Sequence, residues 1–184
     1  MRQDDLDALP DDLPVPEDDG AADHLPGSRL PSVSLPATDG SAVKLAELPG
    51  RAVVFAYPRT GRPGEQSLGG DEAWDAIPGA RGCTPQACAI RDRHDRFEAL
   101  GVRVFGLSTQ TGDDQREAAE RLHLPYPLLS DPGASLGLPT FEVEGVTLYK
   151  RLTLIVRDGA VEKALYPVFP PDEAAAQALT ALGR

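Results

Sequence analysis

The architecture of this chain can be read most directly from the stretch Gly82-Cys83-Thr84-Pro85-Gln86-Ala87-Cys88. Thr84 suits the N-cap of an α-helix, and Pro85 suits the first helical position, where a backbone N–H is not needed. Gly101 is a stop signal at the other end. The pattern predicts a helix over residues 84–100 whose start carries both cysteines of this 184-residue chain.

The spacing of the two cysteines limits how they can react with each other. In an α-helix, residues five apart have Cα atoms ~8.6 Å apart, whereas a disulfide needs them within ~7 Å. Cys83 and Cys88 can therefore be joined only after the first helical turn unwinds, which favours a catalytic cycle over a static structural bond. Zinc sites carry further Cys or His at matched spacing. The three histidines are scattered, so we expect no metal site.

Strand and helix periodicities alternate through the rest of the chain. We expect strands at residues 33–35, 42–45, 52–57, 102–107, 126–129, 146–149, 152–156 and 160–165, a long loop at 58–82, and further helices at 113–122 and from residue 171 onward. This order predicts an α/β protein with a thioredoxin-like fold, in which a central mixed β-sheet is flanked by helices.

The first 27 residues differ from the rest in composition. They hold nine acidic residues against one arginine, and most of the formal net charge of -11 therefore lies there. The segment is also rich in proline and poor in bulky apolar side chains. We expect residues 1–27 to be a disordered or peripherally packed tail, and residues 28–184 to form one domain.

The same composition bears on location and partners. The tail lacks the basic start and apolar run of a signal peptide, and nothing else approaches transmembrane length. We therefore expect a cytoplasmic protein without membrane contact, in a reducing setting where a close cysteine pair is more often redox-active than structural. The nearly neutral body argues against nucleic-acid binding. We expect a monomer or a weak homodimer.

The position of Cys83 indicates its chemistry. A cysteine at a helix start lies among unpaired N–H groups and at the positive end of the helix dipole, and both favour the thiolate. Rapid oxidation also requires donors that stabilise negative charge on a departing oxygen, so an arginine should face this helix start. Arg151, which enters the predicted strand 152–156, is the candidate. The alternative is a surface charge at a strand end.

Within this framework the segment reads Gly82-Cys83-Thr84-x-x-Ala87-Cys88-x-x-Arg91-Asp92, which resembles the active-site segment of peroxiredoxins of the bacterioferritin-comigratory, or peroxiredoxin Q, type. The resemblance extends over most of the body, through residues 52–58, 104–108, 128–131 and 151–156.

The resemblance implies a thioredoxin-fold peroxidase that uses neither metal nor organic cofactor. Cys83 would be the peroxidatic cysteine, Cys88 the resolving cysteine and Arg151 the active-site arginine. It further implies hydrogen peroxide and organic hydroperoxides as substrates, an intramolecular Cys83–Cys88 disulfide, and a thioredoxin-like dithiol as the reductant.

One part of the family pattern is missing. The family places a proline and a threonine at fixed positions before the peroxidatic cysteine, and this chain has Ala76 and Ala80 there. Pro58 and Thr60 occur earlier, separated from the cysteine by an apparent insertion at residues 61–80. Either the Pro58–Thr60 segment still folds over the site, or the threonine hydroxyl is lost.

The candidate substrate-pocket residues are therefore Pro58, Thr60, Gly82 and Thr84. The insertion contains the single tryptophan, Trp74, and forms either a lid over the pocket or a surface loop with a packed aromatic ring.

Two other functions stay open. A thiol–disulfide oxidoreductase on the same fold is disfavoured because the tighter C-x-x-C pair is absent. A non-enzymatic redox sensor or interaction module would use the same disulfide as a switch, with the acidic tail binding a partner.

Overall fold

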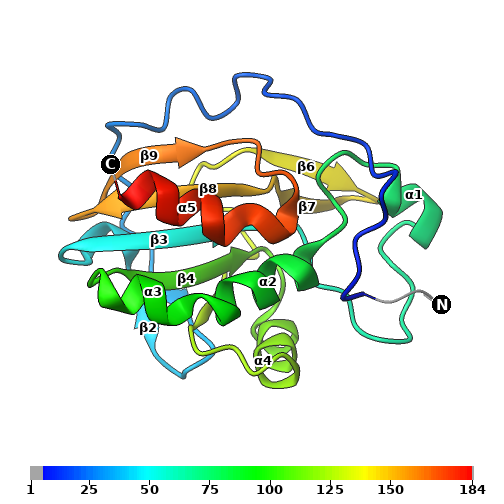
Figure 1. The fold of residues 1–184 in the computed structure, drawn as a ribbon, viewed down its shortest axis with the longest axis horizontal. Helices are drawn as coiled ribbons and strands as arrows, with labels where there is room; N and C mark the ends of the chain where they lie inside the picture. Colours follow the sequence, from blue (N-terminus) through cyan, green and yellow to red (C-terminus); the bar gives the residue numbers. More distant parts are fainter. Residues whose placement is uncertain (1–5, 184) are drawn as a thin grey trace.

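The computed structural model describes residues 6–183. The central sheet consists of β3 (Arg51–Ala56), β4 (Arg103–Ser108), β5 (Leu128–Ser130), β8 (Leu152–Arg157) and β9 (Ala160–Leu165), in the order β5-β4-β3-β8-β9 (Figure 1). β3 is parallel to β4, and β4 to β5, whereas β8 is antiparallel to both β3 and β9. The sheet is therefore mixed, as predicted.

Smaller elements complete the fold. Two antiparallel pairs are formed by β1 (Leu35–Pro36) with β2 (Ala42–Val43), and by β6 (Thr140–Val143) with β7 (Val146–Tyr149). The helices are α1 (Asp71–Asp75), α2 (Cys83–Asp92), α3 (His94–Ala99), α4 (Gly112–Arg121) and α5 (Ala174–Leu182), with short 3-10 helices η1 (Leu45–Glu47) and η2 (Pro171–Glu173). Figure 1 shows α2, α3 and α5 against one face of the sheet.

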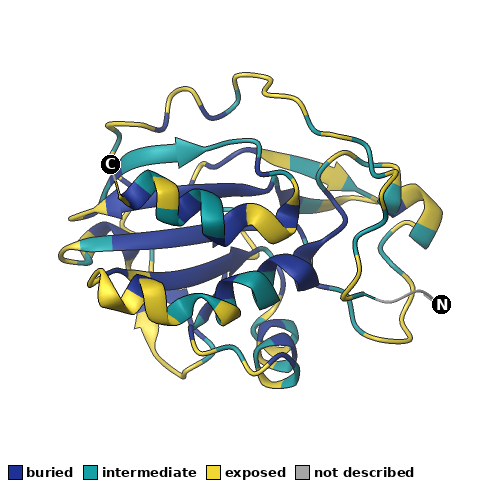
Figure 2. Ribbon diagram, in the orientation of Figure 1, coloured by how far each residue is buried: buried dark blue, intermediate teal, exposed yellow. Residues whose placement is uncertain are grey.

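The central strand β3 is apolar and buried from Ala52 to Ala56, where it is covered on both faces. Val53 and Phe55 pack under the helices, with Ile90 of α2 and Phe97 of α3. The alternate residues of β3 pack on the opposite face, against the loops and the small β1–β2 pair. In Figure 2 the inner strands are accordingly dark blue, and the outer surface of α3 is mostly yellow.

Most predicted elements are confirmed, including the strands of the central sheet, the β1–β2 hairpin and the C-terminal helix. Strand β6, helix α1 and the 3-10 helix η1 were not predicted. Strand β6 follows a glycine- and proline-rich stretch, and its side chains are not fully buried, so its apolar pattern is weak. Helix α1 is five residues long and lies within the segment that was predicted to be a loop.

The prediction of one helix over residues 84–100 with Thr84 as N-cap is wrong in two respects. The N-cap is Gly82, which has a φ of 110° that glycine alone adopts readily, so Cys83 is the first helical residue. The helix also ends at Asp92, and α3 follows after Arg93. At this break the N–H of Arg93 bonds to Ile90, three residues back, in a tight turn instead of a continuous α-helix.

Residues 6–27 lie along the outside of the body, and most of their side chains are exposed (Figure 2). Ala22 and Leu25 are buried against the core on the loop-covered face of the sheet. Within residues 6–183, no helix has the length and apolar character that spanning a membrane requires.

Candidate active site

Cys83 lies at the start of α2, with its side chain only 5% exposed. Cys88 lies in the same helix, five residues later, and is half-buried; both are free thiols. In an intact helix their Cα atoms are ~8.6 Å apart, beyond disulfide range. The two thiols therefore cannot join in the conformation that the structure shows.

Arg151, in the turn between β7 and β8, lies directly against Cys83. Its Nη2 is 3.2 Å from Cys83 Sγ, and it also donates to the backbone carbonyls of Gly79 (3.2 Å), Ala80 (3.2 Å) and Arg81 (3.3 Å). The side chain is only 3% exposed. Arg151 is thus not a surface strand-end charge but a buried cation held beside the sulfur, where it can stabilise negative charge.

Gln86 holds the other side of the same guanidinium. Its side-chain Oε1 accepts a hydrogen bond from Arg151 Nη1. Gln86 is 1% exposed, and it lies three residues after Cys83, so both project from the same side of the helix start. Among the residues that the structure describes, Gln86 Nε2 and Arg151 Nε have no hydrogen-bond partner. Orientation of Arg151 therefore depends on the first turn of α2.

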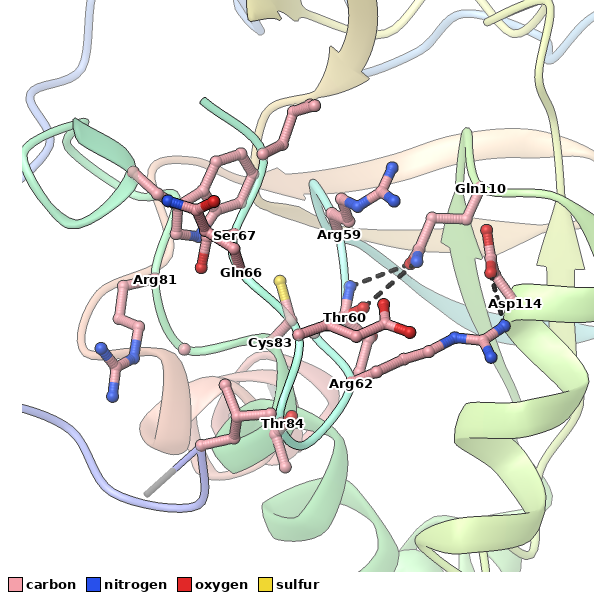
Figure 3. Close-up of a pocket in the computed structure, with 16 residues that line it drawn as sticks. Arg59, Thr60, Arg62, Gln66, Ser67, Arg81, Cys83, Thr84, Gln110 and Asp114 are labelled. Atoms are coloured by element: carbon pink, nitrogen blue, oxygen red, sulfur yellow. Dashed lines mark hydrogen bonds and ion pairs between the residues drawn. The ribbon is translucent and has the colours of Figure 1, made fainter. Parts of the chain in front are cut away.

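A pocket opens in front of the Cys83 sulfur (Figure 3). Gly82 and Thr84 of the α2 start line it, as does Thr60, which follows β3. Gln110 lines it from the residues that follow β4. Because the neighbouring strands β3 and β4 are parallel, both end at the same edge of the sheet, and the pocket lies beyond that edge.

The Pro58–Thr60 segment folds over the site despite the long stretch between it and Cys83. The N–H of Thr60 donates to Gln110 Oε1 at 2.9 Å, and Gln110 Nε2 donates back to the Thr60 carbonyl at 3.2 Å (Figure 3). Ser108 Oγ donates to the Pro58 carbonyl at 3.2 Å. Thr60 lines the pocket, whereas Pro58 is buried and does not.

Ala80, at the position where the family carries threonine, takes no side-chain part in the pocket. It packs with Trp74 and Leu148 in a small apolar cluster, and its carbonyl accepts from Arg151. Trp74 itself is 5% exposed and lines the pocket, together with Arg62 and Gln66 of the 61–80 segment. The 61–80 segment thus supplies both a packed aromatic ring and part of the pocket lining.

The sequence analysis missed Gln86, Ser108 and Gln110. Ser108 and Gln110 are polar residues at the carboxyl end of a buried strand, which is where ligand-binding side chains gather in α/β folds. That signal was available. Gln86 lies inside the cysteine segment, but nothing in its spacing indicated that its partner would be Arg151.

Two further ionisable side chains at α2 are Cys88, which is half-buried, and Tyr126, which is buried. Burial raises the pKa of Cys88, an effect that Arg91 opposes and the carboxylates of Asp7 and Asp92 strengthen. Burial also raises the pKa of Tyr126, whose hydroxyl donates to the carbonyl of Ala87 at 2.9 Å. Cys88 is therefore mostly a thiol at neutral pH, and Tyr126 supports the helix as a neutral donor.

No group of three or more His, Cys, Asp or Glu side chains suited to hold a metal ion occurs within residues 6–183.

A family model described as Redoxin matches residues 25–182. The chain is 30% identical over 152 residues to the chloroplastic peroxiredoxin Q of Oryza sativa subsp. japonica, a match covering 80% of this chain and 61% of that protein. It is 31% identical over 112 residues to peroxiredoxin bcp1 of Schizosaccharomyces pombe, covering 60% of this chain and 48% of that protein. The chain thus spans only part of the length of these relatives.

Solved structures agree. The peroxidoxin BcpB from Mycobacterium tuberculosis superimposes with a TM-score of 0.67 at 27% identity, covering 87% of this chain and 97% of that one. The bacterioferritin comigratory protein of Xanthomonas campestris has a TM-score of 0.65 at 20% identity, covering 85% and 96%, and shows the same fold.

Proposed function

This chain belongs to the redoxin family and to its peroxiredoxin Q type, and we propose that it is a thiol-dependent peroxidase that uses two cysteines. One observation carries the proposal: the buried Cys83 sulfur faces a pocket while Arg151 Nη2 lies 3.2 Å from it. A buried cation beside a nucleophilic sulfur is the arrangement that oxidation by a peroxide requires.

In the first step the Cys83 thiolate attacks one oxygen of the hydroperoxide. The S–O bond forms as the O–O bond breaks, and the other oxygen leaves as an alkoxide or hydroxide that takes up a proton. Arg151, with the unpaired N–H groups at the α2 start, stabilises the charge that moves onto the leaving oxygen. The sulfur is oxidised to a sulfenic acid, and the peroxide is reduced to an alcohol or water.

In the second step Cys88 attacks the sulfenic sulfur, so that a Cys83–Cys88 disulfide forms and water leaves. Because the intact helix holds the two thiols too far apart, the first turn of α2 must unwind before this step. Unwinding also exposes Cys88, and this removes the burial that raises its pKa. The resolving thiol thus becomes more nucleophilic in the conformation that needs it.

In the third step a dithiol reductant of the thioredoxin type restores both thiols by disulfide exchange and is itself oxidised to a disulfide. Hydrogen peroxide and organic hydroperoxides are the proposed substrates.

Burial of Cys83 separates this proposal from a thiol–disulfide oxidoreductase. Disulfide exchange requires access of a second protein's disulfide to the attacking sulfur, and Cys83 is 5% exposed. A small hydroperoxide reaches a buried sulfur through a pocket; a protein disulfide does not.

Trp74, the single tryptophan, provides the test, because it lines the same pocket as Cys83. Its fluorescence should change on mixing reduced protein with hydrogen peroxide, at a rate that rises linearly with peroxide concentration. The change should vanish in Cys83→Ser. A wild-type rate no greater than that of free cysteine would contradict the proposed function.

A further inference from the structure

We infer that residues 6–19, here called the N-terminal strap, form one wall of the peroxide pocket and restrict it to small hydroperoxides, hydrogen peroxide above all. This inference names the substrate class of the proposed peroxidase site and therefore rests on the proposed function. In Figure 1 the dark blue strap runs beside the loop that leads into α2.

The strap contacts the residues that form the pocket. Leu6 lines the pocket together with Cys83, and a Cβ atom built on Gly61 would lie 3.2 Å from Leu6 Cδ2. Leu9 lies against the helix start, since a Cβ built on Gly82 would lie 2.9 Å from Leu9 Cδ2. Both leucines thus lie against glycine backbone where a larger residue would leave no room for them. Leu6 itself lines the pocket, and Leu9 packs against the helix start beside it.

Polar contacts hold the strap at both ends. Near its start, the Ala8 carbonyl accepts from Arg81 Nη2 at 3.3 Å. At its other end the Asp19 carboxylate accepts from Lys150 Nζ and from Tyr166 Oη, each at 2.9 Å. The hydrogen bonds from Lys150 and Tyr166 lower the pKa of Asp19 far below its ordinary value. The Asp19 anchor therefore stays charged at every pH at which the enzyme would work.

The strap belongs to this chain rather than to the family pattern. The Redoxin match begins at residue 25, so the whole strap lies outside it. The wall opposite comes from the 61–80 insertion, through residues such as Gln66 and Trp74. The strap, which lies outside the family match, and the 61–80 segment together line the pocket that contains Cys83.

The size of the pocket sets the substrate class. The volume of the pocket is about 50 Å³. A cavity needs at least about 10–15 Å³ to hold one water, and pockets for drug-sized ligands measure about 300–1,000 Å³. Hydrogen peroxide, with two heavy atoms, fits. The aromatic group of cumene hydroperoxide does not fit unless Leu6 moves away.

The first test compares second-order rate constants for oxidation of Cys83 by hydrogen peroxide and by cumene hydroperoxide, measured by mass spectrometry in the full-length protein. Wild type should strongly prefer hydrogen peroxide. Leu6→Ala removes the wall and Asp19→Asn loosens its anchor, so both should raise the ratio of the cumene rate to the hydrogen peroxide rate, by roughly tenfold for Leu6→Ala. Val15→Ala is the matched control, because Val15 is in the same strap but 63% exposed; it should leave the ratio unchanged.

Equal rates with both peroxides in wild type, or a ratio unchanged in both Leu6→Ala and Asp19→Asn, would overturn the inference.

A second readout does not depend on peroxidase activity. In a Cys88→Ser background, Cys83 is alkylated with iodoacetamide and with the much larger fluorescein maleimide. Leu6→Ala should raise the rate of alkylation by the maleimide relative to that by iodoacetamide. An unchanged ratio would contradict the inference that the strap forms a wall of the pocket.

If this ratio rises while no variant reacts rapidly with any peroxide, the proposed function is wrong and the inference about the strap is supported. If peroxide reduction is fast but Leu6→Ala changes neither the ratio of peroxide rates nor the ratio of alkylation rates, the inference about the strap is wrong and the proposed peroxidase function is supported.

Discussion

Helices α2 and α4 are both ten residues long, but they begin in opposite ways. The start of α4 is capped: the Thr111 side chain accepts from the N–H of Asp114, and two acidic residues lie in the first turn. The start of α2 has no side-chain cap, no acidic residue in its first turn, and Gly82 at the N-cap.

The difference shows what each helix start is for. Capping groups and acidic residues at a helix N-terminus satisfy its free N–H groups and its positive dipole end, and each stabilises the helix. In the proposed mechanism, these groups at α2 serve the Cys83 sulfur and the peroxide that it attacks. The missing cap also makes the first turn easier to unwind, which the proposed disulfide requires. In the proposed mechanism, the missing cap therefore favours both the reaction of Cys83 with peroxide and the unwinding of the first turn.

The largest expected effect comes from removing the sulfur at the α2 start. Cys83→Ser should abolish peroxide reduction, because a serine hydroxyl is not ionised at neutral pH and does not attack a peroxide. Stopped-flow fluorescence of Trp74 measures this. Cys88→Ser is the comparison, and its first oxidation should remain fast. Retained peroxide reduction in Cys83→Ser would place the reactive group elsewhere.

Arg151→Lys tests the cation that lies beside the Cys83 sulfur at the α2 start. Lysine keeps the charge but cannot donate simultaneously to Gln86, to the backbone carbonyls and to the sulfur as the planar guanidinium does. We expect the rate of Cys83 oxidation to fall by about 10²-fold, the loss typical of a removed oxyanion donor. A rate within a factor of about three of wild type would mean that charge alone suffices.

The pH dependence of Cys88 distinguishes the folded from the unwound α2. Its raised pKa lies above the ordinary 9.0, so the thiolate fraction should increase about tenfold per pH unit from pH 7 to pH 9. Iodoacetamide alkylation of Cys88 in Cys83→Ser should follow that slope without a plateau. A plateau below pH 9 would show that Cys88 is not shielded in the folded helix.

Gly82→Ala tests the glycine N-cap. A Cβ atom there would lie 2.6 Å from Pro171 Cγ, and the φ of 110° is unfavourable for alanine. We expect the free energy of unfolding to fall by about 1–3 kcal/mol, measured by urea denaturation. Gly101→Ala is the control, because its φ is also positive but no atom lies within 4 Å of the added Cβ. It should cost less, and an equal loss would show that backbone strain alone accounts for the effect.

The smallest effect is expected at the capped helix. Thr111→Ala should lower the free energy of unfolding by about 1 kcal/mol, since it removes a side-chain cap. Peroxide oxidation of Cys83 should not change. Thr111→Ser keeps the hydroxyl and should recover most of the loss. A changed rate of Cys83 oxidation in Thr111→Ala would mean that the two helix starts are coupled.

The features that could be predicted from the sequence are those that a local pattern of residues determines. Apolar runs such as residues 52–57 identify buried strands, and the order of elements identifies the fold class. The cysteine segment singled out Cys83, and the need for a cation at the helix start, with the resemblance of residues 151–156, singled out Arg151. The structure places the two in contact. The segment Pro58–Thr60 also lies over the site, the first of the two outcomes considered for it.

The rest depends on tertiary contacts that no local pattern encodes. The break at Arg93 falls within a continuous helical periodicity, so the sequence predicted one helix instead of two. In the sequence, Gln86 and Gln110 look like ordinary polar residues. Only the folded chain brings Arg151 to Gln86 and Thr60 to Gln110. The composition of the strap shows that it is acidic and has few bulky apolar side chains. It does not indicate that Leu6 lines the pocket.

In the proposed cycle the uncapped first turn of α2 opens so that Cys83 and Cys88 can join, and the time course of thiol loss reports on this step. Reduced protein is mixed with one equivalent of hydrogen peroxide, and its intact mass and free thiols are followed from milliseconds to minutes. We expect rapid loss of both thiols and of two hydrogen atoms, whereas Cys88→Ser should stop at a sulfenic acid on Cys83. Survival of both thiols for many minutes, or a sulfenic acid that persists in wild type without disulfide formation, would contradict the proposed cycle.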